Sequence, residues 1–273
     1  MAIRAYAHQG GALEGPSSTL KAIEDAIKNG ATAIELDVHA TLDRKLVVCH
    51  DSSVDRTTNS KGAISSFTLK ELKKLDNAYW FVKGKGSVVD ADESEYVLRG
   101  KAPQDNDYTI ATLAEVLLSF PGVMLNLDIK QTSPSVHPYE DILASELREF
   151  NRRDDVIVAS FLDKATESFK LLAPEIPISA GTEATAEFYR CVKNSSLPSK
   201  IDYVALQVPH YFGDIEVVTK DFVEAAHSAE LEVHVWTIDD AEEMENLIEV
   251  GVDGIMSDRP SLLVEVLKRK SVY

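Results

Sequence analysis

Short apolar runs alternate with amphipathic, helix-like stretches along nearly the whole chain. The apolar runs predict nine strands, at Arg4–His8, Ala33–Val38, Leu46–His50, Val123–Ile129, Val156–Ser160, Ile178–Ala180, Tyr203–Gln207, Glu232–Thr237 and Asp253–Met256. The helical spacing of apolar residues predicts nine helices, at Thr19–Lys28, Thr68–Leu75, Thr112–Ser119, Tyr139–Phe150, Lys164–Leu172, Ala184–Val192, Lys220–Ala229, Ala241–Val250 and Ser261–Lys268. Strands that alternate with helices are typical of a parallel α/β sheet.

The number of these units favours a closed barrel. Ala33–Val38 and Leu46–His50 are separated only by a short turn at Asp43–Lys45, so one of the two extends or covers a barrel end. The remaining strands give eight β/α units, the number that a (β/α)₈ TIM barrel needs. A doubly wound open sheet would show the same alternation, but no G-x-G-x-x-G follows the first strand. We therefore expect a (β/α)₈ barrel over residues 1–273.

Capping residues mark several helix starts. Ser18 or Thr19 is expected to cap the first helix, Asp163 the fifth and Asp240 the eighth. Asp258 is expected to cap the last helix, which starts near Pro260. The segment from Asn77 to Thr109 has no clean period, and long loops of this kind are usually functional or flexible. We expect it to be a small insertion on the barrel, near the mouth of the active site.

Charge and composition exclude several classes of partner. The formal net charge is −17, which argues against binding to nucleic acids or anionic membranes, because both need clustered Lys and Arg. No apolar run reaches the 18 residues of a membrane-spanning helix, and no basic, then apolar, leader opens the chain. Two cysteines, Cys49 and Cys191, make no disulfide framework. We expect a cytoplasmic protein without stable membrane insertion.

Acidic residues gather on strands that the barrel would bring together. Active sites of such barrels lie at the carboxyl ends of the strands. Glu35 and Asp37 share one face of their strand, as do Asn126, Asp128 and Lys130 on theirs, because alternate strand residues point the same way. Three buried carboxylates need a compensating charge. Oxygen ligands of this kind suit Mg²⁺ or Ca²⁺, so Glu35, Asp37 and Asp128 are candidate metal ligands. The alternative is that these acids pair with Lys130 or with arginines.

Two histidines end separate strands and could face the same cavity. They are His8 and His50, each placed beside the acidic cluster. Histidine titrates near neutral pH, so a pair can serve as general acid and general base. The alternative is a structural role for each.

The chain resembles a known family at motifs that occur in the family's order. Ala7-His8-Gln9-Gly10-Gly11 with Pro16-Ser17-Ser18-Thr19 is similar to H-R-G…P-E-N-T, and Glu35-Leu36-Asp37-Val38 matches E-L-D-V. His50-Asp51 with Asp55-Arg56-Thr57-Thr58-Asn59 matches H-D…D-R-T-T-N, and Asn126-Leu127-Asp128-Ile129-Lys130 matches N-x-E-x-K with Asp for Glu. Trp236-Thr237 and Asp253-Gly254-Ile255 with Ser257-Asp258-Arg259-Pro260 match W-T and D-G-I-x-T-D-x-P. This is the pattern of the glycerophosphodiester phosphodiesterase family.

The resemblance implies a phosphodiesterase-type barrel with an insertion after its early units. It implies a divalent metal on Glu35, Asp37 and Asp128, His8 and His50 as acid and base, and Lys130 near the phosphate. By analogy His8 is the acid and His50 the base. The implied reaction releases sn-glycerol 3-phosphate and an alcohol from a glycerophosphodiester. Apart from the resemblance, Trp236 is a candidate to pack on the substrate's glycerol or alcohol end, and the alternative is an ordinary aromatic at the barrel end.

Two positions depart from the family pattern. Gln9 stands where the pattern has arginine, and Ser17 stands where it has glutamate. An amide offers the substrate phosphate a neutral donor in place of a bidentate guanidinium. The joint loss of one positive and one negative group suggests that the two residues form a coupled pair.

Two other functions remain open. A lysophospholipase D or cyclising phosphodiesterase would need an apolar groove, which Tyr79, Trp80, Phe81 and Tyr96 of the insertion could supply. A catalytically silent barrel that binds phosphate or metal finds support only in Gln9 and Ser17.

Overall fold

Parallel strands form a closed barrel in the computed structural model, which describes residues 2–102 and 104–273. Seven strands pair in the order β7-β6-β2-β1-β12-β11-β8. Their bounds are β1 Arg4–His8, β2 Ala33–Ala40, β6 Met124–Ile129, β7 Val156–Ala159, β8 Ala205–Pro209, β11 Glu232–Trp236 and β12 Gly254–Ser257. The gap between β7 and β8 is bridged by Ile178 and Ser179, which pair in parallel with Val158 and Ala205. The predicted strand at Ile178–Ala180 is therefore a short seam that completes the eight-membered ring.

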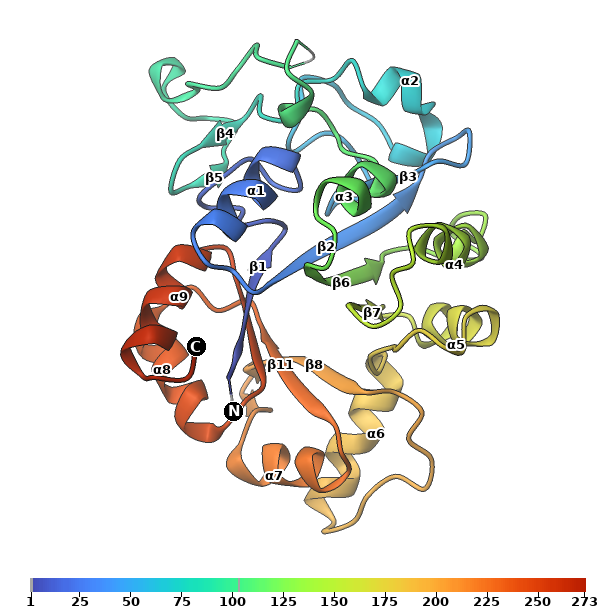
Figure 1. Ribbon diagram of the computed structural model, residues 1–273, viewed down its shortest axis with the longest axis vertical. Helices are drawn as coiled ribbons and strands as arrows, with labels where there is room; N and C mark the ends of the chain where they lie inside the picture. The colour runs from blue at the N-terminus through green and yellow to red at the C-terminus, as the bar shows by residue number, and fades with distance from the viewer. Residues whose placement is uncertain (1, 103) are drawn as a thin grey trace.

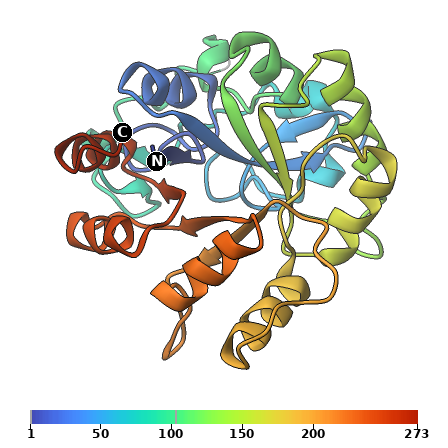
Figure 2. The ribbon, with the colours of Figure 1, turned by 60° about the horizontal axis from the view of Figure 1, so that its bottom comes forward.

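Helices surround this ring on the outside (Figure 2). They are α1 Leu20–Lys28, α3 Leu113–Ser119, α4 Glu140–Glu149, α5 Asp163–Leu172, α6 Thr182–Lys193, α7 Lys220–Ser228, α8 Ala241–Val250 and α9 Pro260–Arg269. The short helix α2 (Leu69–Leu72) lies outside this layer, and its Leu72 packs in a separate apolar cluster with Val47 and Ile64. Apolar side chains from the outer strand faces and the inner helix faces form one large buried core, with Ile34, Leu36, Leu127 and Phe169 among its members. Burial of this layer is the main favourable term for the fold.

The remaining strand covers one barrel end, as the short turn in the sequence predicts. β3 (Leu46–Val48) pairs antiparallel with the end of β2, with Val38 opposite Val48. This pairing turns the chain back so that His50 follows close to the acidic end of β2. Cys49 points away from His50 into a small apolar cluster with Val54.

The segment predicted as an insertion lies beyond α1 and α3, at the upper edge of the view in Figure 1. It contains the strand pair β4 (Phe81–Val82) and β5 (Gly86–Ser87) and the 3₁₀ turns η2 (Glu93–Glu95) and η3 (Asn106–Tyr108). The Arg99 guanidinium lies over the Tyr96 ring at 3.7 Å and also faces Tyr79 and Trp80. Among the described residues, no helix is long and apolar enough to cross a membrane.

Two helix-cap predictions are wrong. Asp163 does not cap α5 but is its first residue, and its carboxylate accepts the backbone N–H groups of Glu183 and Ala184 at the start of α6. Asp258 does not cap α9, because Arg259 holds the N-cap position without a side-chain bond and Asp258 turns toward His8. Thr19 and Asp240 cap α1 and α8 as predicted.

Candidate active site

Strand register brings the predicted site residues into adjacent rows inside the barrel. His8 lies beside Glu35 between β1 and β2, and Glu35 lies beside Asn126 between β2 and β6. One step further along, Asp37 lies beside Asp128. Alternation along each strand turns all of these side chains to the interior. The structure thus brings together all three candidate metal ligands and His8 at the carboxyl ends of neighbouring strands.

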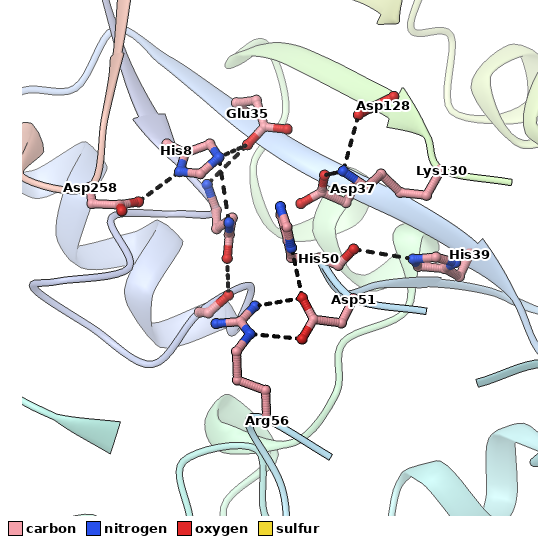
Figure 3. Close-up of polar contacts among 12 residues, drawn as sticks. His8, Glu35, Asp37, His39, His50, Asp51, Arg56, Asp128, Lys130 and Asp258 are labelled. Atoms are coloured by element: carbon pink, nitrogen blue, oxygen red, sulfur yellow. Dashed lines mark hydrogen bonds and ion pairs between the residues drawn. The ribbon is translucent and has the colours of Figure 1, made fainter. Parts of the chain in front are cut away.

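His8 is held between two carboxylates (Figure 3). Its Nδ1 lies 2.7 Å from Asp258 Oδ1, and its Nε2 lies 3.7 Å from Glu35 Oε2. Burial by itself lowers the pKa of His8, but the hydrogen bond to Asp258 and the charge of Glu35 outweigh it and raise that pKa to about 9. These contacts stabilise the imidazolium form and fix which ring nitrogen faces the cavity.

His50 is oriented by a second, separate carboxylate. Its Nδ1 lies 2.7 Å from Asp51 Oδ1, and Arg56 donates to both oxygens of Asp51 at 2.8 and 3.1 Å. Hydrogen bonds from His50 and Arg56 outweigh burial and hold the pKa of Asp51 well below its usual range. The His8 and His50 rings are 6.2 Å apart, centre to centre, so both reach the same cavity. Buried His39 lies with its Nε2 3.4 Å from the carbonyl oxygen of His50.

Lys130 lies between two of the acids and balances part of their charge. Its Nζ is 3.0 Å from Asp37 Oδ1 and 3.4 Å from Asp128 Oδ2. Burial opposes the charged lysine, but both carboxylates raise the pKa of Lys130. Burial and the charge of Asp37 raise the pKa of Glu35, and burial raises that of Asp128. The pairing of these acids with Lys130, which was the alternative to a metal site, is therefore present. One ammonium, however, does not balance the charge of three carboxylates.

The donor set fits a hard cation in its chemistry. Asp37 Oδ2 and Asp128 Oδ1 are buried without a hydrogen-bond partner, and a buried carboxylate oxygen normally has one. Carboxylate oxygens are the ligands that Mg²⁺ and Ca²⁺ prefer. In their present rotamers the acids do not converge, since within residues 2–102 and 104–273 no three His, Cys, Asp or Glu side chains are grouped to hold an ion. Lys130 and the side-chain torsions would therefore have to shift.

Gln9 and Ser17, the two positions that depart from the family pattern, contact each other. Ser17 Oγ donates to Gln9 Oε1 at 2.6 Å, and both side chains are buried. Gln9 Nε2 lies 3.4 Å from His8 Nε2, while the Gln9 backbone N–H donates to Glu35 at 3.1 Å. Gln9 is absent from the lining of the cavity that His8 and His50 share, and it lies against His8.

The cavity has a volume of about 510 Å³ and two unlike walls. His8, His50, the three acids and Lys130 form the polar wall. The opposite wall is largely apolar and includes Phe161, Tyr189, Phe212, Ile215 and Trp236. Trp236 packs edge-to-face on Phe161, with ring centres 5.4 Å apart. Phe81 and Tyr96 of the insertion are buried in their own segment and contribute nothing to this wall.

Several site residues were missed by sequence reasoning. Asp258 and the Asp51–Arg56 pair belong to quoted motifs. Asp51 directly follows His50 in the sequence, which was an available signal, whereas Asp258 is 250 residues from His8 and had no signal beyond its motif. Asn126, which also lies in a quoted motif, lines the cavity and accepts a hydrogen bond from Gln207. Gln207 comes from a strand that no motif covers, so only the closed barrel shows its place.

Comparison with known proteins decides the family. A model of the glycerophosphoryl diester phosphodiesterase family matches residues 8–262. The chain belongs to this family. A glycerophosphodiester phosphodiesterase of Caldanaerobacter subterraneus subsp. tengcongensis is 31% identical over 267 residues, which cover 96% of this chain and 97% of the relative. One from Bacillus altitudinis is 28% identical over 268 residues, which cover 96% of each chain.

Solved structures agree on the fold. A glycerophosphodiester phosphodiesterase from Agrobacterium tumefaciens superposes with a TM-score of 0.73 at 22% identity, covering 97% of this chain and 100% of that one. An Oleispira antarctica phosphodiesterase, solved in complex with the product sn-glycerol-3-phosphate, gives a TM-score of 0.71 at 24% identity, covering 98% and 97%. The predicted family, the (β/α)₈ barrel and the enzyme class, a glycerophosphodiester phosphodiesterase, are confirmed.

Proposed function

We propose that this phosphodiesterase hydrolyses a glycerophosphodiester to sn-glycerol 3-phosphate and an alcohol, with His8 and His50 as acid and base and a divalent cation on Glu35, Asp37 and Asp128. One observation carries the proposal. Each histidine binds a carboxylate through Nδ1 and so leaves Nε2 for the cavity, where the three acids also lie. This arrangement provides two oriented proton-transfer groups beside a cluster of hard oxygen ligands.

In the proposed reaction, His50 accepts the proton of the nucleophile, which is water or a neighbouring substrate hydroxyl. The nucleophile's oxygen bonds to phosphorus as the bond from phosphorus to the alcohol oxygen breaks. His8, held as imidazolium between Asp258 and Glu35, donates its proton to the departing oxygen. Lys130 faces the phosphate from the polar wall, and Trp236 contacts the glycerol or alcohol end. A bound divalent cation would neutralise charge on the phosphoryl oxygens.

Metal dependence is tested by chelation and by direct binding. Excess chelator should abolish turnover of glycerophosphocholine, and Mg²⁺ or Ca²⁺ should restore it. Glu35→Gln and Asp37→Asn should each weaken Ca²⁺ binding in calorimetry, because a charged ligand becomes neutral. Glu167→Gln, an exposed acid on α5, is the control and should bind as the wild type does. Full activity in excess chelator would refute the metal proposal.

The acid and base can be told apart by the leaving group. His8→Ala should lower turnover of glycerophosphocholine by about 10²–10⁴-fold, the usual contribution of a general acid. The loss should shrink strongly on a p-nitrophenyl phosphodiester, whose leaving group needs no proton. His50→Ala should lower the turnover of both substrates by about the same factor. The reverse pattern would exchange the two roles, and a loss of less than about tenfold with glycerophosphocholine in either variant would remove that histidine from proton transfer.

A second candidate, action on lysophospholipids, is favoured by the apolar wall. Phe212 and Ile215 are exposed on this wall, on the strand pair β9 (Tyr211–Phe212) and β10 (Ile215–Glu216), and Phe161, which is also exposed, lines the same cavity. An acyl chain would cover these side chains. Phe212→Ser with Ile215→Ser should then lower turnover of lysophosphatidylcholine and spare glycerophosphocholine. Equal effects on both substrates would mean that the apolar wall contacts the alcohol group and not an acyl chain. If the wild type turned over neither substrate, the protein would be a catalytically silent barrel.

A further inference from the structure

Below the catalytic cavity, a line of polar side chains runs through the barrel interior. Arg4 Nη1 lies 2.5 Å from Glu232 Oε2, near the amino ends of the strands, and His234 Nε2 lies 3.1 Å from the same oxygen. Gln207 Nε2 then lies 3.4 Å from His234 Nδ1 and 2.6 Å from Asn126 Oδ1. His234 and Asn126 are buried, and Arg4, Glu232 and Gln207 are half-buried. Polar groups in such places need partners, and none of these five residues has a part in the proposed proton transfers.

Each hydrogen bond in this line of side chains has one group that must donate and one that must accept. Hydrogen bonds from His234 and Arg4 outweigh burial and lower the pKa of Glu232 to about 2, so it is an ionised acceptor. His234 Nε2 must therefore carry the proton that it donates to Glu232. Arg4 also lies 3.4 Å from His234 Nε2, but its guanidinium has the shorter contact with Glu232. With one proton on the ring, held at Nε2, His234 Nδ1 is an acceptor for the Gln207 amide nitrogen 3.4 Å away.

This direction sets the orientation of two amides. Since His234 Nδ1 accepts, Gln207 presents its NH₂ group to it, and the second proton of that group goes to Asn126 Oδ1. The Asn126 oxygen is then occupied. Its Nδ2 has no hydrogen-bond acceptor among residues 2–102 and 104–273, and Asn126 lines the cavity beside Glu35. A donor at this point faces the place where an anionic substrate would lie.

We propose that Asn126 Nδ2 donates a hydrogen bond to an oxygen of the bound phosphodiester. Gln207, His234 and Glu232 are positioning residues that keep the Asn126 side-chain amide from flipping, which would exchange its nitrogen and oxygen. The inference rests on the proposed function of the cavity. If the amide flipped, Asn126 Oδ1 would face the phosphate, and two hydrogen-bond acceptors, Oδ1 and the phosphate oxygen, would meet without a proton between them.

The test exchanges donor and acceptor in the hydrogen bond between residue 207 and Asn126. Gln207→Glu keeps the shape but offers an acceptor to Asn126, so the Asn126 amide turns its NH₂ away from the cavity. KM for glycerophosphocholine and the inhibition constant of sn-glycerol 3-phosphate should both rise about 10–100-fold, the range for a lost hydrogen bond to a charged group. The value of kcat should change much less, because the contact is made in the ground state as well. Glu232→Gln, which frees the tautomer of His234, should raise both constants a few fold.

Matched variants separate positioning from folding. Asn126→Ala should match the loss of Gln207→Glu, and the double variant should lose no more than either, since both remove one contact. Gln207→Met, which removes the polar group, should give constants between those of the wild type and those of Gln207→Glu, and it provides the test if the glutamate variant does not fold. Met124, two residues before Asn126, packs against the buried side chains of Tyr6, Ala33 and Met256, and Met124→Leu should leave both constants unchanged.

The outcomes also separate this inference from the proposed function. Constants within about twofold of the wild type for Gln207→Glu and Asn126→Ala, or losses that multiply in the double variant, would overturn it while leaving wild-type turnover intact. If the wild type hydrolysed nothing, the proposed function would fail, and calorimetry with inorganic phosphate would still show whether Asn126 contributes to binding an anion.

Discussion

At the residue scale, Gln9 and Ser17 occupy positions where the family pattern has a charged pair. Their side chains are hydrogen-bonded to each other and buried, and Gln9 also reaches the ring of His8. Contact between the two positions is what a joint replacement requires. The direct contact supports a coupled pair more than it supports a separate contact of Gln9 with the phosphate.

Restoring one charge alone should therefore be harmful. Gln9→Arg adds a cation without a partner, and Ser17→Glu adds an anion near existing carboxylates. Each single variant should lose about 3–5 kcal/mol of stability, the usual effect of an unpaired buried charge. The double variant should recover much of the loss, because residues in contact are not additive. Thermal unfolding and kcat/KM of the wild type, the two single variants and the double variant complete a double-mutant cycle.

The opposite result has a clear form. If the two effects add to within about 0.5 kcal/mol, the residues are independent. If Gln9→Arg alone tightens the binding of inorganic phosphate, Gln9 acts on the substrate directly.

Residue types and strand alternation were enough to predict the histidines and the acids of the candidate site. His8, Glu35, Asp37 and Asp128 lie on strands whose pairing partners follow from the fold, so their proximity could be expected. Asp258 was assigned to a helix cap, because a carboxylate just before Pro260 suits that position equally well. Only its distance from His8 separates the two roles.

At the element scale, local signals placed most strands and helices to within two residues. Apolar spacing depends only on neighbouring residues, so α8 was predicted with its observed bounds. Asp163 shows where this fails. Its carboxylate caps the following helix, α6, at Glu183, 20 residues further along a stretch that includes α5 itself. Gly181 is needed there because a Cβ would lie 2.6 Å from the Asp163 carboxyl carbon. A contact between two helices leaves no periodic trace in the sequence.

Helix α4 carries a carboxyl that opposes folding at neutral pH. Burial, with the charge of Glu149 adding to it, raises the pKa of Glu146 to about 7, and its Oε2 has no hydrogen-bond partner. A raised carboxyl pKa means that stability is lost as pH rises from the unfolded value, about 4.3, through the folded value. Glu146→Gln should therefore stabilise the protein at pH 8 by about 1 kcal/mol after solvent screening, and hardly at all near pH 4.

Melting temperatures of the two proteins at both pH values check this sign. Glu167→Gln, on the exposed face of α5, is the control and should show no pH-dependent gain. An equal gain for Glu146→Gln at both pH values would mean that lost packing or propensity, and not ionisation, separates the variant from the wild type.

At the scale of the whole molecule, the regular alternation of strands and helices predicted the barrel because each unit repeats the same local pattern. Contacts that cross the barrel, such as Gln207 to Asn126, depend on ring closure and could not be read in advance. The insertion's own arrangement, with Arg99 among three aromatic rings, was equally hidden because it has no period. The cytoplasmic location, the lack of nucleic-acid binding and the single-domain organisation stay predictions of the sequence.

The seam at Ile178–Ala180 gives the ring one narrow closure. The Ser179 N–H donates to Val158 and the Ala180 N–H to Ala205, whereas β2 is paired along most of its length with β1 and β6. Ring opening should start here, so in native-state deuterium exchange the amides of Ser179 and Ala180 should exchange faster than that of Leu36. Both residues also line the cavity, so adding sn-glycerol 3-phosphate should slow their exchange and leave Leu36 unaffected. The bound product would then hold the barrel closed at its least hydrogen-bonded junction, and occupancy of the site would be coupled to how often the whole ring opens.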